Sequence, residues 1–511
     1  MQTSDDRALL VPTTHPDRIL TAVRKSKRTP EGVLVYWGYN EARKLAALGF
    51  DAPSPMLRDY AWCGRLKPFD HQKDTASFLS IRERAFCFNE QGTAKTGSVI
   101  AAADYLMKIG KVTRVLVLCP LSIMKSAWQG DLFKFAMHRS HDVAHGTAKQ
   151  RKRVIESGVE FVIMNFDGLA ITEKEVLHGG FDLIVVDECN AYKNPTTTRW
   201  KVLNRVVHVL QPRLWMLTGT PAAHSPLDAF GLAKLVNPGG VTPYFGQFRD
   251  QVMVKVSNFR WVPKRTSAAT LHRVLQPAIR YEKKDCLDLP PVTFMSRDAP
   301  LTKMQKAYYV MLKSQLLIDS QGEEVSAVHA AAKLTKLLQI SGGAVYTDEG
   351  NILEFDVSSR LKVIEEVIDE ASHKVLVFVP FNHTIDLLYE HLTKRKITCA
   401  SIDGRTKASA RNNIIREFQN DTDPQVLILQ PAAAAHGLTL TAADTIIWYA
   451  PVTSTEIYLQ ANARIDRPGQ LHPMTIVHIR GSPVEDRLYS MLQGHINDQS
   501  KLIDLYRSVI K

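Results

Sequence analysis

Short runs of Val, Ile and Leu recur along the chain, and they constrain its fold more than any other feature. Each run ends in polar, Gly or Pro residues, and a segment long enough for a helix follows it. A parallel sheet covered on both faces needs strands of this near-continuous apolar kind, because both sides of every strand are buried. We therefore predict an α/β protein with two doubly wound parallel-sheet lobes. The runs lie at 114–120, 161–165, 182–188 and 214–221 in the first half, and at 374–380, 425–431, 444–451 and 475–481 in the second.

The length of the chain, 511 residues, exceeds what one hydrophobic core fills. Near the N-terminus, the segment 32–50 predicts a strand followed by a helix. Between the lobes, apolar side chains at helical spacing predict an amphipathic helix over 301–317. The predicted parts are an N-terminal accessory unit at 1–62, the first lobe at 63–238, an inter-lobe linker and helical protrusion at 239–355, and the second lobe at 356–511.

The composition is that of a globular protein with an excess of basic residues. Lys and Arg total 64 against 52 Asp and Glu, which gives a formal net charge of +12. Because Lys and Arg neutralise phosphates, this balance favours a polyanionic partner. A solvated basic surface would have the same composition, so charge alone does not decide between the two interpretations.

Neither the cysteines nor the apolar segments indicate export or a membrane. The six cysteines lie far apart and form no CxxC pair and no zinc-site spacing. The first residues lack the basic start and apolar core of a signal peptide, and no run of about 18 uncharged apolar residues occurs. We expect a protein of a bacterial or host cytoplasm, or of the nucleus if the source is eukaryotic, with no membrane partner.

The segment NEQGTAKT, from Asn89 to Thr96, matches part of a phosphate-binding loop. In the pattern GxxxxGK(S/T), glycines let backbone N–H groups close around phosphates, the Lys reaches the β- and γ-phosphates, and the hydroxyl holds Mg²⁺. Asn89 and Ala94 stand where the pattern has glycine, whereas Lys95 and Thr96 match it. A helix-like run follows, which would put Lys95 at a helix N-terminus that favours phosphate. A working site, a decayed site and an accident all stay open, and Ala94 is unfavourable only if its φ is positive.

Two other groups of charged residues suit the same chemistry. Asp187 and Glu188 end an apolar run, and in a phosphate-loop ATPase one such carboxylate helps to hold Mg²⁺ while the other orients the attacking water. Arg464 and Arg467 are three residues apart, hence on one face if the segment is helical. An Arg supplied from another lobe stabilises the charge on a transferring γ-phosphoryl group. Taken singly, the carboxylates would be a solvated strand end and the arginines surface residues, so their combination with the loop carries the prediction.

An ordered series of segments resembles the helicase motifs of superfamily 2, and specifically those of the Swi/Snf-type DNA translocases. The form QxxxRxxRxGQ, at 460–470, is the most specific of them, and the resemblance runs from Leu66 to Leu505. The resemblance implies two RecA-like lobes in a compact, bacterial or viral-like member of the family. The segments are LKPFDHQ, NEQGTAKT, CPLSIMKSAW, VVDECN, LTGTP, KVLVFVPF, IDGRTKASAR, HGLTLTAAD and QANARIDRPGQ.

This resemblance implies ATP as substrate, Mg²⁺ as cofactor, and a role for each matching residue. Gln72 would read the adenine, Asp187 would hold the metal with Thr96, and Glu188 would activate water. The residues implied to bind ATP are Gln72, Gly92, Thr93, Ala94, Lys95, Thr96, Gly437, Arg464 and Arg467, and those implied to couple hydrolysis to movement are Thr218, Gly219 and Thr220.

The resemblance also implies that the lobes hold DNA by its phosphates, without sequence preference. We chose the candidate contacts from loops that follow strands: Ser122, Lys125, Asn165, Arg405 and Thr439. Four features depart from the family pattern, namely Asn89 for an acidic residue, Ala94 for Gly, Asn190 for His, and an Ala run with His436 for a glycine-rich stretch.

The resulting hypothesis is an ATP-dependent translocase, monomeric, acting on double-stranded or branched DNA. Replication-fork remodelling, strand annealing, recombination or repair are the expected roles, with replication or repair proteins as partners. One alternative is a helicase that separates strands of DNA or RNA. Another, from a different class, is a DNA-binding protein that does not hydrolyse ATP and is built on a decayed ATPase fold.

Overall fold

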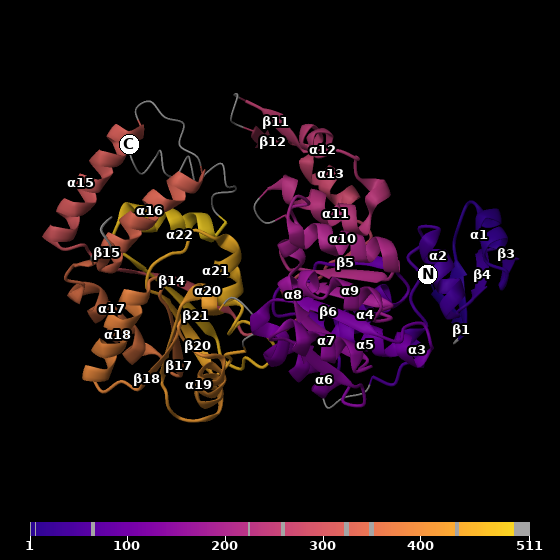
Figure 1. The fold of residues 1–511 in the computed structure, drawn as a ribbon, viewed down its shortest axis with the longest axis horizontal. Helices are drawn as coiled ribbons and strands as arrows, with labels where there is room; N and C mark the ends of the chain where they lie inside the picture. The colour runs from indigo at the N-terminus through magenta and orange to yellow at the C-terminus, as the bar shows by residue number, and fades with distance from the viewer. Residues whose placement is uncertain are drawn as a thin grey trace. The chain divides into compact units, whose positions relative to one another are not determined.

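The computed structural model describes residues 2–5, 7–62, 67–222, 225–256, 261–320, 327–346, 352–434 and 439–494. It divides into two compact units, one of Met1–Ala222 with Pro226–Leu287 and the other mainly of Asp288–Lys511. Figure 1 labels their helices and strands, and each unit is described by itself.

The first unit begins with a small antiparallel sheet of order β1-β2-β4-β3. Alternate residues of β2 and β4 are buried, and they pack with Ile19 and Leu45 of the helices α1 and α2. The predicted strand and helix at 32–50 are β4 and α2, so this prediction is confirmed. The elements are β1 (Gln2–Asp5), β2 (Ala8–Val11), α1 (Pro16–Ala22), β3 (Ser26–Thr29), β4 (Gly32–Tyr36), α2 (Tyr39–Ala47) and α3 (Met56–Asp59).

The large sheet of the first unit has seven strands in the described residues, in the order β13-β5-β10-β9-β6-β8-β7, and every pair is parallel. The four predicted apolar runs are confirmed as β6, β8, β9 and β10. The strands are β5 (Arg84–Cys87), β6 (Val115–Cys119), β7 (His141–Ala144), β8 (Phe161–Asn165), β9 (Leu183–Asp187), β10 (Arg213–Leu217) and β13 (Ala278–Ile279).

Helices bury both faces of this sheet, as the continuous apolar strands require. Val185 of β9 packs in one core with the helices α4 and α5, whereas the next residue, Val186, packs in another with α10 and α11. The helices and remaining strands are α4 (Asp70–Ser80), α5 (Lys95–Lys108), α6 (Gly130–Phe135), α7 (Ala148–Glu156), α8 (Phe166–Ile171), α9 (Glu173–Leu177), α10 (Thr198–Leu210), α11 (Ala229–Val236), α12 (Phe245–Val252), β11 (Met253–Lys255), β12 (Trp261–Pro263), α13 (Ser267–Val274) and α14 (Lys283–Cys286).

The register of the strands brings their carboxyl ends to one level. Leu217 of β10 pairs with Cys87 on one side and with Asp187 on the other. Cys119 of β6 pairs with Asn165 of β8. The loops that follow these strands therefore meet at a single edge of the sheet, where open α/β sheets bind ligands.

The second unit repeats this plan with an all-parallel sheet of order β14-β21-β20-β17-β19-β18. The predicted runs of the second half are confirmed as β17, β19, β20 and β21. Val377 packs with the helices α17 and α18, and its neighbour Phe378 packs with α16, α21 and α22 on the other face. The strands are β14 (Val292–Asp298), β15 (Ala344–Tyr346), β16 (Ile352–Glu354), β17 (Lys374–Phe378), β18 (Cys399–Ile402), β19 (Val426–Leu429), β20 (Ala443–Trp448) and β21 (Met474–Arg480). The helices are α15 (Lys303–Ser320), α16 (Ala327–Gly342), α17 (Ser358–Glu370), α18 (Asn382–Lys394), α19 (Ala408–Asn420), α20 (Pro431–Ala434), α21 (Thr455–Asn462) and α22 (Pro483–Leu492).

The stretch 239–355, which the sequence sets apart as a linker, contributes to both units. β13 joins the first sheet beside β5, β14 joins the second beside β21, and the compact units divide between Leu287 and Asp288. The helix predicted over 301–317 is present as α15, but Met304 and Met311 of its predicted apolar face are exposed, so its amphipathic character is not confirmed. None of the helices in the described residues combines the length and the apolar character needed to cross a bilayer.

A buried ion pair ties α17 to α22 in the second unit. Arg360 Nη2 lies 2.8 Å from Glu485 Oε1, and the two side chains are 1% and 0% exposed. Arg360 also donates to the carbonyl of Tyr449, and Glu485 Oε2 accepts from the backbone N–H groups of Gly481 and Ser482. Both charges are thus paired and hydrogen-bonded, as buried charges must be.

We predict that Glu485→Ala lowers the free energy of unfolding of the second unit by about 3–5 kcal/mol, because it leaves the Arg360 charge buried and unpaired. Glu366→Ala in α17 is the matched control, since Glu366 faces Lys362 across 3.9 Å with both side chains exposed. Exposed ion pairs of that kind contribute little to the free energy of unfolding. Chemical denaturation measures both variants, and an equal loss in the two would contradict the prediction.

Candidate functional site

The loop between β5 and α5 has the architecture of a phosphate site. α5 begins at Lys95 and runs for 14 residues with no acidic side chain in its first turn. Its unpaired N–H groups and positive dipole end are therefore available to an anion. Lys95 folds back over the loop, and its Nζ donates to the carbonyls of Asn89 and Glu90 at 2.8 and 3.0 Å.

The backbone of the loop takes the shape that glycines normally provide. Gly92 has φ 84°, and Ala94, the residue before Lys95, has φ 56° and ψ 42°, which is the left-handed region. An L-residue with a Cβ pays a conformational cost there that glycine does not. The loop is thus built around Lys95 with Ala94 in the strained position that the sequence left undecided.

Helix α4 braces this loop from one side. Gln72 is buried; its Nε2 donates to the carbonyl of Ala94 at 3.2 Å, while its Oε1 accepts from the N–H of Phe69 at 3.0 Å. His71 Nε2 lies 2.9 Å from the carbonyl of Thr93. The predicted adenine-reading residue therefore touches the loop directly, and its contact with adenine stays a prediction.

Asn89, which replaces the acidic residue of the family pattern, uses both ends of its amide. The side chain is fully buried; Nδ2 donates to Thr75 Oγ1 at 2.8 Å and Oδ1 accepts from the N–H of Tyr281 at 3.0 Å. A carboxylate could not donate in this way, so the substitution changes the hydrogen bonding at the start of the loop.

Asp187 ends β9 level with the start of the loop. Its Oδ2 accepts from Trp128 Nε1 at 2.9 Å and its Oδ1 accepts from the N–H of Glu188 at 3.0 Å. Burial raises the pKa of Asp187 to about 6, and the neighbouring Glu188 acts in the same direction, whereas Lys95 opposes the rise. A cation bound here would favour the ionised form further.

Glu188 presents a carboxylate oxygen that has no hydrogen-bond partner among the described residues. The residue has φ 51°, and its Oε1 accepts from Gln91 Nε2 at 3.2 Å. Its Oε2 is buried and makes no hydrogen bond to the residues that the structure describes. A buried unsatisfied carboxylate oxygen is costly, and a water held against a phosphate would satisfy it.

These residues fit a magnesium–nucleotide better than a metal held by protein alone. Within the described parts of the chain, no three His, Cys, Asp or Glu side chains gather into a metal cage. Mg²⁺ commonly binds one or two carboxylates, waters and substrate phosphates instead. Thr96, beside Lys95 in the first turn of α5, and Asp187 are the residues that would hold it.

The predicted coupling segment after β10 joins the same edge. Thr218 is buried and its N–H donates to the carbonyl of Cys87 at 3.1 Å. A Cβ added to Gly219 would come within 3.2 Å of the Gln91 nitrogen, so the backbones approach closely there. Asn190, in the place of the family's His, donates to the carbonyl of Thr220 at 3.1 Å. The structure thus brings the segment against the loop, and its role in movement stays a prediction.

The predicted arginines belong to the second unit and lie beyond a helix. α21 ends at Asn462, so the condition that Arg464 and Arg467 share a helical face is not met. Arg464 is buried and donates to the carbonyl of Gln460 at 2.8 Å, whereas Arg467 donates to Thr439 Oγ1 at 2.9 Å. Gly437, also predicted here, and His436 lie outside the described residues.

The predicted DNA contacts differ in whether their side chains already form hydrogen bonds or ion pairs within the protein. Lys125 is exposed, and Asn165 Oδ1 accepts from Arg151 Nη1 at 2.8 Å. Arg405 forms ion pairs with Asp386 at 2.7 Å and with Asp403, and these carboxylates raise its pKa. Its charge is neutralised within the unit, which disfavours it as a phosphate contact in this state. The side chain of Ser122 lies outside the described residues.

Two side chains of the site, Trp128 and Gln91, did not enter the predicted residue set. Both lie inside motifs that the sequence analysis quoted, SAW and NEQGT. Nothing in the sequence marks their contacts with Asp187 and Glu188, because those contacts join residues that are 59 and 97 positions apart.

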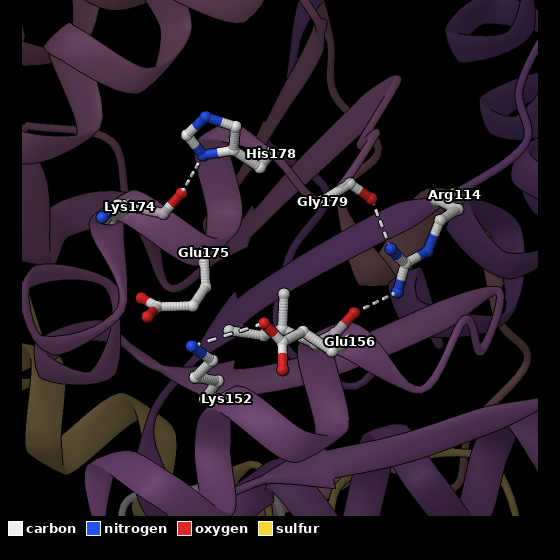
Figure 2. Close-up of a pocket in the computed structure, with 8 residues that line it drawn as sticks. Arg114, Lys152, Glu156, Lys174, Glu175, His178 and Gly179 are labelled. Atoms are coloured by element: carbon white, nitrogen blue, oxygen red, sulfur yellow. Dashed lines mark hydrogen bonds and ion pairs between the residues drawn. The ribbon is translucent and has the colours of Figure 1, made fainter.

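A separate hollow opens at the amino end of β6, away from the strand ends that carry the loop residues. Figure 2 shows that Arg114 points to carbonyls at its rim, and that Lys152 pairs with Glu156 of the same helix, α7. The Arg114 guanidinium donates to the carbonyls of Val159, Ile155 and Gly179. The guanidinium therefore caps carbonyls at the C-terminal end of α7 and in the turn after α9, which is a structural role.

We predict that Ala94→Gly raises the free energy of unfolding of the first unit by about 1 kcal/mol, because glycine relieves the left-handed strain. Ala170→Gly in α8 is the control, since it is exposed and helical; it should lower the same quantity by about 1 kcal/mol. Denaturant titration of both variants tests this, and a loss of stability in Ala94→Gly would contradict the loop geometry.

Comparisons with known proteins identify the family of the chain. The model of the SNF2-related domain matches residues 71–343, and that of the helicase conserved C-terminal domain matches 359–469. "Chromodomain-helicase-DNA-binding protein 1-like" of Mus musculus is 26% identical over 78% of this chain and 46% of its own length. Protein p41 of Acyrthosiphon pisum secondary endosymbiont phage 1 is 24% identical over 87% of this chain and 98% of its own.

Among solved structures, the Sulfolobus solfataricus SWI2/SNF2 ATPase core in complex with dsDNA is 22% identical, with a TM-score of 0.42, over 86% of this chain and 93% of that one. The chain spans less than half the length of the first curated relatives it matches, between 38% and 46%. The SNF2-related match covers more than half of the 511 residues. The chain therefore belongs to the SNF2-related family, and its two large parallel sheets are those of two RecA-like lobes.

Proposed function

We propose that this protein is an ATP-driven translocase that moves along double-stranded or branched DNA. The observation that carries the proposal is the meeting of Lys95, Asp187 and Glu188 at one edge of the first sheet, with a buried oxygen of Glu188 left for a ligand. Family membership and the net charge of +12 support a nucleic-acid partner. The retained charged groups argue against a decayed, non-hydrolysing site.

In the proposed hydrolysis, Lys95 leaves the loop carbonyls and pairs with the β- and γ-phosphates, while the first N–H groups of α5 hold their oxygens. Mg²⁺, held by Thr96 and Asp187, would neutralise the charge of the phosphate oxygens. A water attacks the γ-phosphorus, the bond to the β–γ bridging oxygen breaks, and ADP departs. Glu188 Oε2 accepts the proton that the water loses.

The second unit would complete the reaction and carry the motion. We propose that Arg464 and Arg467 stabilise the charge on the transferring phosphoryl group, as arginines do in related ATPases. Thr218, Gly219 and Thr220 would transmit the movement of the loop to the DNA contacts, among them the exposed Lys125. Contacts to phosphates alone would give no sequence preference.

The biological setting that we propose is replication-fork remodelling, strand annealing, recombination or repair. The protein would act as a monomer on DNA in the cytoplasm, or in the nucleus of a eukaryotic cell, with replication or repair proteins as partners. The accessory sheet of β1 to β4 would supply recognition of a DNA structure or of such a partner.

We predict that Lys95→Ala lowers DNA-stimulated phosphate release about 100-fold or more, because a phosphate-stabilising charge is lost. Lys108→Ala, at the exposed end of the same helix, is the matched control and should leave the rate unchanged. Phosphate release is measured with single-stranded, duplex and forked DNA. Stimulation that survives Lys95→Ala, or that is absent from the unmutated protein, would refute the ATPase assignment.

A second prediction separates a translocase from a strand-separating helicase. The protein should displace a triplex-forming strand from a duplex in the presence of ATP, because motion along the duplex removes the third strand. Glu188→Gln should retain DNA binding and lose displacement, since the proton acceptor is absent. Unwinding of tailed DNA or RNA without triplex displacement would favour the helicase alternative.

A further inference from the structure

We propose that Trp128 is a positioning residue for Asp187, and that it ties this carboxylate to the turn that carries Lys125. The inference rests on the proposed function, because it concerns the carboxylate that we assign to Mg²⁺. Its evidence is a separate contact, the hydrogen bond from Trp128 Nε1 to Asp187 Oδ2 at 2.9 Å.

The contact is buried and its direction is fixed. Trp128 is 0% exposed and is among the largest fully buried side chains, and Asp187 is 9% exposed. An indole nitrogen only donates, and an ionised carboxylate only accepts. Water competes little for either group at such burial, so the pair holds its geometry without a solvent-exposed alternative.

Both oxygens of the Asp187 carboxylate are thereby constrained. Oδ1 accepts from the N–H of Glu188 at 3.0 Å and Oδ2 accepts from the indole. Because each carboxylate oxygen has two lone pairs, one on each stays available to a metal or its waters. Outer hydrogen bonds of this kind orient metal-binding side chains, and losing one typically costs 10–100-fold in affinity or activity.

The backbone around Trp128 connects this carboxylate to the surface. Trp128 lies in a single π-helical turn, Met124–Gln129, which follows β6 and the short 3₁₀ turn Leu121–Ile123. Such wide turns are frequent at functional sites. Lys125, in the same turn, is exposed, whereas Trp128 packs in the core with Met124 and Leu132. A phosphate that binds Lys125 therefore acts on the turn that holds the indole.

If Trp128 only packed in the core, loss of its N–H group would not change the Mg²⁺ dependence of nucleotide binding. Its ring belongs to the core that also contains Val185 and Leu217, and removing a ring from a core destabilises a protein. Phe keeps most of the ring and lacks the N–H. The Phe variant therefore removes the hydrogen bond while it retains most of the packing.

The test compares Trp128→Phe with Trp215→Phe in the full-length protein. Trp215 is equally buried, lies in the same core, and donates to the carbonyl of Arg82 at 3.2 Å instead of to a predicted site residue. We expect Trp128→Phe to raise the Mg²⁺ concentration needed for half-maximal binding of a fluorescent ATP analogue by 10–100-fold. DNA-stimulated turnover should fall by a similar factor, whereas Trp215→Phe should change neither.

The link to Lys125 is tested by a double-mutant cycle. Lys125→Ala should reduce the stimulation of hydrolysis by duplex DNA in the unmutated background and have a smaller effect in Trp128→Phe, because the path from Lys125 to Asp187 is then broken. Additive effects of the two substitutions would overturn the coupling part of the inference.

The outcomes separate this inference from the proposed function. Equal Mg²⁺ dependence in Trp128→Phe and Trp215→Phe would overturn the positioning role, even if both variants lose the same stability. A protein that binds the analogue with Mg²⁺ but hydrolyses no ATP would refute the ATPase proposal and still report the Trp128 effect on binding. A protein that binds no nucleotide with Mg²⁺ would overturn both.

Discussion

The parallel register of the first sheet is the constraint on which the candidate site depends. Parallel strands run in one direction, so their carboxyl ends and the loops that follow share one edge. The pairing of Leu217 with both Cys87 and Asp187 sets the phosphate loop, the coupling segment and the acidic pair side by side. A sheet of mixed direction would send some of these loops to the opposite edge. The site therefore follows from topology before any side chain is considered.

Within that frame, the phosphate loop is held from several directions at once. Gln72 and His71 bond the carbonyls of Ala94 and Thr93, and Gly219 packs against Gln91. This bracing explains how Ala94 persists with positive φ, since strained backbone survives where its surroundings determine it. Departure from a motif therefore does not by itself indicate a decayed site. The residues around the loop allow Ala in place of Gly at position 94, and a comparison of motifs does not take those residues into account.

The sequence predicted the strands well, for a physical reason. Strands buried on both faces must be continuously apolar, so β9 and β17 are visible without a structure. Contacts between residues far apart in the chain could not be predicted from the sequence. β13 is a two-residue strand far along the chain from its partner β5, and Trp128 reaches Asp187 through the core. Likewise, only the structure reveals that carboxylates already neutralise Arg405.

The segment around Tyr281 shows how one of these hidden contacts bears on mechanism. β13 pairs with β5, and beyond it the N–H of Glu90 donates to the carbonyl of Tyr281 at 3.0 Å. Glu90 Oε2 in turn accepts from the N–H of Lys283 at 2.9 Å, and Tyr281 OH donates to Asp74 in α4. This segment comes a few residues before Asp288, where the chain passes into the second unit. Lys95 binds the carbonyls of Asn89 and Glu90, so under the proposed mechanism its release toward a phosphate would change the charge beside the residues that hold the connecting chain. The hydrogen bonds of Glu90 thus hold Tyr281 and Lys283 against the loop, and the chain continues covalently from these residues to Asp288 and the second unit.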